Sequence, residues 1–536
     1  MRGADLVAAT LARAGVKVIF SLSGNQIMPI YDACIDAGIR LIHTRHEGAA
    51  VYMAEAYAQL TGEVSIAMIT AAPGFASGLG PLYMARMAEN PILLLSGDAP
   101  LSLNGKGAFQ ELDQVSISAP LTKLSRRTER AVDLGSDIAK AIQVAASGRP
   151  GPVHIALPFD LLNADVGDHP LPAIDDFAPK MMPPDDQAVR TIVEAVASAQ
   201  RPVILTGPAQ NPSRAQGRLQ ELADALDAPV VAMESPRGLN DPCLGDFAKT
   251  LSRADLIVSL GKNIDFSTGF GKPPAMNDEC GFLIVDPEVE VLERARRAFG
   301  PRTVLAHQAD ANAALRALVA QGQGSVERSA WRAEMASAIA ARPSEPAQPG
   351  DGPMRPAILC AAVQRFLDAA DDPILVIDGG EFGQWAQACI SAETRIINGP
   401  SGAIGGALCY ALAAKIARPG ATVVVLMGDG TIGFHLAEFE TAHRYGADFI
   451  AVIGHDARWN AEYQIQLRDY GADRINESLL NPTRYDLAAA GLGCHGVHVT
   501  DAAELDDALK RADDSGLPVC LVAEIEGLPA PSGSGH

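Results

Sequence analysis

The chain has 536 residues, 48% of them hydrophobic and 20% charged, which is the composition of a globular protein with about three or four domains. Its formal net charge of −21 argues against a nucleic-acid partner, because neutralising phosphates requires clustered lysine and arginine. No apolar stretch reaches the roughly 20 residues that span a membrane and no signal-peptide core follows Met1, so we expect a cytoplasmic protein without a membrane partner.

Strand-length apolar runs alternate with alanine-rich helical patterns along the chain, which predicts parallel sheets with helices between the strands. The expected strands lie at residues 17–20, 64–69, 91–96, 152–158, 202–205, 229–232, 256–260, 282–286, 373–380, 421–427 and 449–453. Stretches rich in proline at about 168–186 and 342–356 are predicted linkers, and the tail at 531–536 is predicted to be disordered. We therefore predict an α/β protein with three doubly wound parallel-sheet domains, at 1–167, 186–341 and 357–530.

The first candidate functional residue is Asp429, in the sequence Gly-Asp-Gly-Thr at 428–431 that follows an expected strand. Ligands bind at the carboxyl ends of the strands in such sheets, and glycine together with a helix N-terminus favours a phosphate there. Asp456 follows the next expected strand, so its loop should lie beside the first one. Because Mg²⁺ prefers oxygen ligands, we expect Asp429, Asp456 and the backbone carbonyl of Arg458 to hold the ion together with a diphosphate. Such a turn alone often only caps a helix, and the second acid is what favours a metal site.

Glu47 is the second candidate. It lies at an expected helix start, where the helix dipole stabilises an acid, so a structural role is the simpler interpretation. Small and apolar residues follow it at 48–54, however, and they would partly desolvate the carboxyl. Desolvation favours the protonated form of a carboxyl, which suits a role in proton transfer.

Motifs near both ends of the chain carry a family resemblance. One group is Arg-His-Glu-Gly-Ala-Ala at 45–50, Pro-Gly at 73–74 and the apolar run at 91–97. The other is Gly-Asp-Gly at 428–430 with Glu438, Arg444, Tyr445 and Asp456. These motifs resemble the pyrimidine-binding and diphosphate-binding domains of acetolactate synthase-like thiamine diphosphate enzymes. The resemblance covers essentially the whole chain and leaves a central domain between them. Asp-Ala-Arg-Trp at 456–459 is most similar to a subgroup of 2-hydroxyacyl-CoA lyase-like and acetolactate synthase-like proteins, and benzaldehyde lyase is a further relative.

The resemblance implies thiamine diphosphate and Mg²⁺ as cofactors and a role for each matching residue. The glutamate that matches Glu47 hydrogen-bonds the aminopyrimidine ring and promotes the tautomer that removes the thiazolium C2 proton. Ile404 matches an apolar residue that wedges between the two rings, although an ordinary core isoleucine would look the same. The other residues that match cofactor-binding positions are Asn25, Gly74, Gln110, Glu381, Phe382, Gly402, Gly428, Gly430, Thr431, Arg458 and Trp459. For the loop amides Asn25 and Gln110, hydrogen bonding to nearby backbone is an equal alternative.

The sequence departs from the family pattern at two places. The family usually has Asn-Asn where this chain has His455-Asp456, but the aspartate still offers an oxygen ligand. Glu381 would be repelled by phosphates, so we expect its side chain to point away from them. The adjacent His-His pair typical of pyruvate decarboxylases is also missing, which argues against simple aldehyde release from pyruvate.

The resemblance implies an enzyme that makes or cleaves a carbon–carbon bond beside a carbonyl, as a 2-hydroxyacyl-CoA lyase-like or acetolactate synthase-like carboligase or decarboxylase. Its substrate would be a small 2-keto acid, an aldehyde or a 2-hydroxyacyl-CoA. An alternative is an FAD-dependent oxidase of the pyruvate oxidase type, but the central domain has no complete Gly-x-Gly-x-x-Gly, so FAD or ADP there lacks support. A binding protein without activity is disfavoured by the presence of Glu47, Asp429 and Asp456. Relatives bind the two ends of the cofactor on different subunits, which implies a homodimer or homotetramer.

Overall fold

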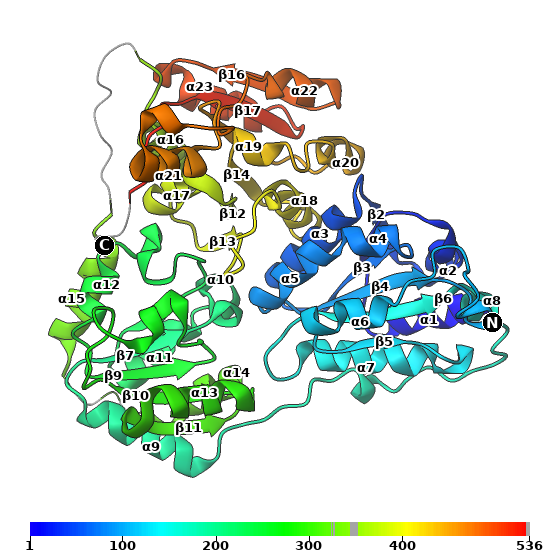
Figure 1. The fold of residues 1–536 in the computed structure, drawn as a ribbon, viewed down its shortest axis with the longest axis horizontal. Coiled ribbons are helices and arrows are strands. Elements are labelled where there is room, and N and C mark those ends of the chain that lie inside the picture. Colours follow the sequence, from blue (N-terminus) through cyan, green and yellow to red (C-terminus); the bar gives the residue numbers. More distant parts are fainter. Residues whose placement is uncertain (323, 325–326, 343–351, 532–536) are drawn as a thin grey trace. The chain divides into compact units, whose positions relative to one another are not determined.

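The computed structural model describes residues 1–322, 324, 327–342 and 352–531. The chain forms two compact units (Figure 1), of which the first contains residues 1–180, 408–419 and 435–447. The second contains residues 181–407 and 420–434 and the described part of the chain from residue 448 onward. Much of the second predicted linker and most of the predicted disordered tail lie outside the described residues.

Three parallel sheets carry the fold, as the sequence predicts. The strand order is β2-β1-β3-β4-β6-β5 in the first sheet, β11-β10-β9-β7-β8 in the second and β13-β12-β14-β15-β17-β16 in the third. The strands of the first sheet are β1 (Val18–Ser21), β2 (Arg40–His43), β3 (Ser65–Ile69), β4 (Ile92–Asp98), β5 (Ser125–Arg127) and β6 (Val153–Pro158). Those of the second are β7 (Pro202–Thr206), β8 (Val230–Ala232), β9 (Leu256–Leu260), β10 (Gly281–Asp286) and β11 (Thr303–Gln308). Those of the third are β12 (Pro373–Ile377), β13 (Thr394–Ile397), β14 (Thr422–Gly428), β15 (Ile450–His455), β16 (His495–Val499) and β17 (Val519–Glu524).

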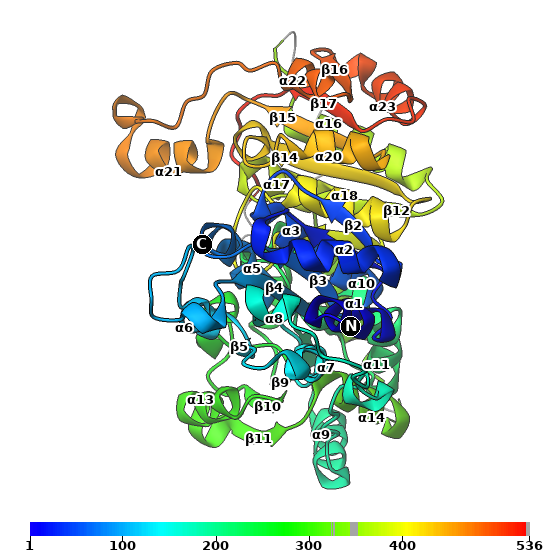
Figure 2. The same cartoon turned by 90° about the vertical axis from the view of Figure 1, so that its right-hand side faces the viewer.

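Helices connect the strands, as parallel pairing requires. In the first third of the chain they are α1 (Gly3–Arg13), α2 (Met28–Ala37), α3 (Glu47–Thr61), α4 (Pro73–Ser77), α5 (Leu79–Met87), α6 (Gln114–Ser118), α7 (Leu134–Ala146) and α8 (Phe159–Asn163). The middle third has α9 (Asp186–Ser198), α10 (Pro212–Ala215), α11 (Arg218–Leu226), α12 (Phe247–Leu251), α13 (Val289–Phe299), α14 (Ala311–Gln321) and α15 (Ser329–Ala340). The last third has α16 (Pro356–Asp368), α17 (Gly380–Cys389), α18 (Ala407–Ala417), α19 (Asp429–Ile432), α20 (Glu438–Tyr445), α21 (Asn460–Tyr470), α22 (Tyr485–Gly491) and α23 (Leu505–Asp513). In the view of Figure 2, α21 lies to one side of the third sheet.

All eleven expected strands are present, and their continuous apolar runs reflect burial on both faces of a parallel sheet. Six further strands complete the sheets: β2, β5, β11, β13, β16 and β17. Five of these six are edge strands, and only β17 has a partner on each side. Edge strands are partly exposed and therefore less apolar; in β11 none of the six residues is fully buried. Their weaker hydrophobic pattern explains why they do not stand out in the sequence.

Among the described residues, no helix is long and apolar enough to cross a membrane.

Candidate functional site

Glu47 lies at the first position of α3, as predicted. His46 is the N-cap residue, and its Nδ1 accepts a hydrogen bond of 2.9 Å from the Gly48 N–H. Gly74, near the start of α4, lies next to the Glu47 carboxylate: an ideal Cβ at Gly74 would be 3.2 Å from Glu47 Oε1 and 2.6 Å from the Cγ2 atom of Thr70. The absence of a side chain at Gly74 therefore leaves space beside the Glu47 carboxylate and the Thr70 methyl group.

Two glutamines and a threonine form a second polar group in the same unit. Gln26 Nε2 donates to Gln110 Oε1 at 2.7 Å, and Gln26 Oε1 accepts from Thr70 Oγ1 at 2.8 Å. Gln110 has a φ of 59°, in the left-handed region that few residues other than glycine adopt. Such conformations gather at functional sites, because the surrounding structure must hold them in place. Gln110 thus has a fixed position, whereas Asn25 is exposed at the start of a short 3₁₀ helix, Asn25–Ile27.

The ends of β14 and β15 bring the two predicted metal ligands into adjacent loops. These strands are parallel neighbours, with Gly428 paired to Gly454. Asp429 starts α19 and is 2% exposed. Its Oδ2 atom lies 2.8 Å from His455 Nδ1 and accepts a hydrogen bond of 2.6 Å from the Ala457 N–H. His455, the residue that departs from the family pattern, therefore orients Asp429.

The electrostatics of these loops favour a cation. Burial, together with the negative charge of Asp429, raises the pKa of the Asp456 carboxyl to about 7. The hydrogen bond to Asp429 raises the pKa of His455. Two neighbouring carboxylates that repel each other are stabilised when a cation binds between or beside them.

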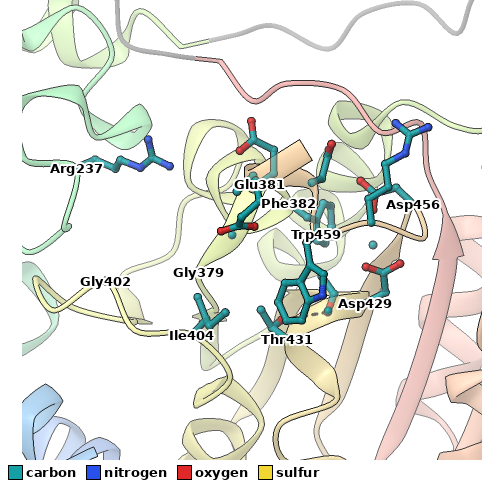
Figure 3. A pocket seen from close by; sticks show the side chains of 18 residues that line it. Arg237, Gly379, Glu381, Phe382, Gly402, Ile404, Asp429, Thr431, Asp456 and Trp459 are labelled. Carbon is teal, nitrogen blue, oxygen red and sulfur yellow. Dashed lines mark hydrogen bonds between the residues drawn. The ribbon is translucent and has the colours of Figure 1, made fainter. Parts of the chain in front are cut away.

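One pocket in the second unit collects the predicted residues of the last third of the chain (Figure 3). Its lining includes Glu381, Phe382, Gly402, Ile404, Gly428, Asp429, Gly430, Thr431, Asp456, Arg458 and Trp459, all of which the sequence singled out. An ideal Cβ at Gly430 would lie 2.8 Å from the Trp459 ring, and an ideal Cβ at Gly454 would lie 2.6 Å from the Phe382 ring. Glycine at these positions is what allows the aromatic rings to pack directly on the loop backbone.

Ile404 is held in this pocket by a buried carboxylate. Asp378, which is 1% exposed, accepts hydrogen bonds from the Gly405 N–H at 2.8 Å and the Ala407 N–H at 3.3 Å. Burial without a cationic partner raises the pKa of Asp378 to about 6, while these backbone hydrogen bonds act in the opposite direction. An ideal Cβ at Gly379 would lie 2.6 Å from Ile404 Cγ2, so the glycine gives this side chain its space.

Glu381 has partners within the protein. Its Oε1 atom accepts a hydrogen bond of 2.6 Å from the Ala530 N–H, and Gln384 Nε2 donates to its Oε2 atom at 3.1 Å. Burial raises the pKa of this carboxyl. The expectation that Glu381 turns away from bound phosphates stays a prediction.

The pocket also contains residues that the sequence did not single out as ligands. Gly379 and Gly454 are strand-end glycines, Glu462 comes from α21, and Arg237 comes from the segment after β8. Arg237 belongs to no motif, and its place in the pocket depends on how the second and third sheets pack. Gly379 could have been found from the sequence, because it lies at the end of an expected strand. No sequence pattern marks Arg237 or Glu462 as a pocket residue.

The donor set fits Mg²⁺ with a diphosphate better than a metal held by side chains alone. Across residues 1–322, 324, 327–342 and 352–531, no three His, Cys, Asp or Glu side chains form a metal-binding group. Mg²⁺ in phosphate sites typically uses only one or two carboxylates and completes its shell with phosphate, backbone and water oxygens. Asp429 and Asp456 meet that requirement, and the loop glycines leave the backbone open for a phosphate.

Comparison with known proteins agrees with the fold and the site. The chain matches the thiamine pyrophosphate enzyme domains, namely the N-terminal TPP binding domain over residues 1–117, the central domain over 189–318 and the C-terminal TPP binding domain over 378–523. It is 34% identical over 534 residues to the acetolactate synthase large subunit IlvG of Mycobacterium tuberculosis, covering 97% of this chain and 95% of that protein. It is 31% identical over 579 residues to the 2-hydroxyacyl-CoA lyase 2 of Homo sapiens, covering 97% and 89%.

The fold is of the α/β class, with three parallel-sheet domains and glycine-lined strand ends. The chain belongs to the thiamine diphosphate enzymes and acts on carbon–carbon bonds. The family resemblance stated from the sequence is confirmed. The matched ranges are shorter than the predicted domains, whose boundaries stay predictions.

Proposed function

We propose that this enzyme uses thiamine diphosphate and Mg²⁺ to make or cleave a carbon–carbon bond beside a carbonyl. The observation that carries the proposal is the pair of carboxylates at adjacent strand ends in a glycine-lined pocket, the buried Asp429 and the half-buried Asp456. The acetolactate synthase and 2-hydroxyacyl-CoA lyase 2 among its relatives favour two reaction classes, the ligation of 2-keto acids and the cleavage of 2-hydroxyacyl-CoA.

Each predicted residue has a defined task in this proposal. Asp429, Asp456 and the Arg458 carbonyl would hold Mg²⁺. The loop backbone at 428–431 and the start of α17 would bind the diphosphate, because N–H groups at helix starts favour anions. When bound, thiamine diphosphate supplies a nucleophilic carbon and stabilises the negative charge that develops beside the substrate carbonyl.

The remaining residues would position the two rings of the cofactor and keep water away from them. Glu47 would share a proton with a nitrogen of the aminopyrimidine ring, and the space beside Gly74 would admit that ring. Gln110 would present its amide from a position held by Gln26. Ile404 would set the angle between the two rings, and Asp378 would keep Ile404 in place through Gly405. Assembly as a homodimer or homotetramer is part of the proposal and is tested by light scattering.

Calorimetric titration of the apoprotein with thiamine diphosphate, with and without Mg²⁺, tests the cofactor site. We expect tight binding that depends on Mg²⁺ in the wild type and weak binding in Asp429→Asn. Gly428→Ala is an informative second variant, because an ideal Cβ at Gly428 meets no atom of the described residues within 4 Å. Its melting temperature should match that of the wild type, while its affinity for the diphosphate falls because the added methyl group occupies ligand space.

Two outcomes would count against the cofactor site. Absence of binding with and without Mg²⁺ would refute the proposal as a whole. Binding that Asp429→Asn leaves unchanged would refute the metal site alone. A positive result would be followed by turnover assays with 2-keto acids, aldehydes and 2-hydroxyacyl-CoAs, which separate ligation from cleavage.

A further inference from the structure

We propose that the first unit contains a second ligand site, which binds a small aliphatic ammonium ion. The site is a cavity of about 360 Å³ that shares no lining residue with the pocket shown in Figure 3. This volume lies within the range of small-molecule sites in proteins. The polar residues that line it are Asp98, Asn104, Glu111, Asp113, Gln114 and Arg127. The cavity lies outside the cofactor site, so its ligand is independent of the proposed function.

The cavity is located where two strands of the first sheet end. Asp98 is the last residue of β4 and Arg127 is the last residue of β5, and both strands pair with β6. The carboxyl ends of parallel strands are where α/β sheets bind their ligands. Arg127 Nε forms an ion pair of 2.6 Å with Asp98 Oδ2, and its other guanidinium nitrogens donate to Asn104 Oδ1 at 2.8 Å and to the Ala99 carbonyl at 3.1 Å. The protein itself therefore uses the cation of this cavity.

Gln114 brings a buried hydrogen-bond acceptor to the cavity. Its side chain is 1% exposed, and its Nε2 atom donates to the Gly97 carbonyl at 2.9 Å. Its Oε1 atom is buried and accepts no hydrogen bond from any of the described residues. The backbone of Gln114 is held from below, since Ser118 Oγ donates to the Gln114 carbonyl at 2.9 Å and lies 2.8 Å from His154 Nδ1. A buried acceptor without a donor is costly, so a ligand that brings an N–H group to this fixed oxygen gains stability.

The ionised groups give the cavity a negative charge. Three carboxylates, those of Asp98, Glu111 and Asp113, line it together with one guanidinium, that of Arg127. Hydrogen bonds from backbone N–H groups lower the pKa of Glu111, and hydrogen bonds from Ser116 lower the pKa of Asp113. Both carboxyls are therefore ionised at neutral pH. A cationic ligand meets attraction in this cavity and an anionic ligand meets repulsion.

The shape and the donor set favour an organic cation over a metal ion. In the part of the chain that the structure describes, no three His, Cys, Asp or Glu side chains are grouped so that they could hold a metal. The cavity is also much larger than a single ion. An ammonium group carries several N–H donors, and the alkyl chain attached to it can pack on Leu112, Val115 and Ala156, which complete the lining. A small aliphatic ammonium compound therefore matches both the polar and the apolar parts of the wall.

Calorimetric titration with probes of equal chain length and different charge tests the site. The probes are butylammonium, the diammonium ion of 1,4-diaminobutane, neutral 1-butanol and anionic butyrate. The full wild-type chain is used with thiamine diphosphate and Mg²⁺ at constant ionic strength. We expect both ammonium probes to bind at one site. The affinities for 1-butanol and butyrate should be lower by about tenfold or more, as for the loss of a hydrogen-bonded charged group.

Two substitutions in the cavity locate the binding site. Asp113→Asn removes a charge and keeps the cap of α6, because asparagine accepts the hydrogen bond from the Ser116 N–H as well as aspartate does. Gln114→Met keeps the length of the side chain and removes the Oε1 acceptor. Each should weaken butylammonium binding by about threefold to tenfold. The matched control is Asp185→Asn, which changes the N-cap aspartate of α9 outside the cavity and should leave the affinity unchanged.

A local readout shows whether the ligand reaches the segment beside Gln110. The Gly107 and Ala108 N–H groups donate to Glu111 Oε2 at 3.0 and 3.1 Å. A ligand that binds beside the Glu111 carboxylate stabilises this segment, so butylammonium should slow hydrogen exchange at both amides. The Asp113→Asn variant should need a higher butylammonium concentration for the same protection.

Three results would overturn the assignment: no saturable binding of either ammonium probe, equal affinities for butylammonium and 1-butanol, or full butylammonium affinity in both folded cavity variants. The comparison of probes uses the wild type alone, so it decides the matter even where a variant does not fold. Failure of thiamine diphosphate to bind would refute the proposed function and leave the ammonium site unaffected.

Discussion

The substitution Gly379→Ala tests whether the position of Ile404 controls activity. Gly379 has φ −74° and ψ −173°, which alanine adopts without strain, so the new methyl group is the main perturbation. Its ideal position is 2.6 Å from Ile404 Cγ2 and 2.8 Å from Asn398 Nδ2. Carbon atoms pack best at about 3.5–4.0 Å, so the Ile404 methyl must move by about 1 Å.

This displacement should affect both the stability of the protein and its kcat/KM. Overpacking in a well-packed region destabilises by about 1–3 kcal/mol, which should lower the melting temperature. A misplacement of about 1 Å near reacting groups can reduce the rate about a hundredfold, so we expect kcat/KM to fall by about tenfold to a hundredfold. The affinity for thiamine diphosphate should change less than kcat/KM, because Gly379→Ala keeps the backbone N–H groups at the start of α17 and leaves Asp429 and Asp456 untouched.

Two further variants separate the contact with Ile404 from general effects of the substitution. Gly428→Ala is the control for stability, because Gly428 is also an N-cap residue with an ordinary φ, but its ideal Cβ has no neighbour within 4 Å in the part of the chain that the structure describes. Ile404→Leu removes the branch methyl, so the double variant Gly379→Ala/Ile404→Leu should recover activity relative to Gly379→Ala. The reasoning fails if Gly379→Ala melts like Gly428→Ala and keeps wild-type kcat/KM, or if the double variant recovers nothing.

Two other predictions concern acidic residues. Glu47→Gln should leave thiamine diphosphate binding largely intact while slowing hydrogen exchange at the thiazolium C2 atom, and unchanged exchange measured by NMR would rule out its role. Glu438, which accepts a hydrogen bond from the Arg45 N–H at 2.9 Å, has its pKa raised by burial to about 7. A raised pKa means that the folded state favours the protonated form, so ionising Glu438 lowers stability as pH rises from about 4.5 to about 7. At pH 8, Glu438→Gln should therefore have a higher free energy of unfolding than the wild type, by up to about 3 kcal/mol, and a higher melting temperature. That advantage should shrink toward pH 5, and equal differences in melting temperature at both pH values would contradict the assignment.

The sequence could predict the three-domain fold because parallel strands covered by helices on both faces leave continuous apolar runs. It could also place two of the acids, since Asp429 and Asp456 each lie just beyond the end of an expected strand, in loops where an α/β sheet binds its ligands. Glu47 was placed by its position at an expected helix start. The adjacency of the Asp429 and Asp456 loops follows from consecutive strands that pair in parallel. These features are determined by local pattern and chain order, which is why the sequence by itself specified them.

Only the tertiary structure decided which distant side chains meet. The hydrogen bonds from Gln26 to Gln110 and from Gly405 to Asp378 join segments with no shared periodicity. The Glu234–Arg395 ion pair depends on how the second sheet packs against the third within one unit, and it brings Arg237 to the pocket without any motif around that residue. Local sequence records how a residue sits in its own helix or strand, whereas such contacts arise from packing between elements that are far apart in the sequence.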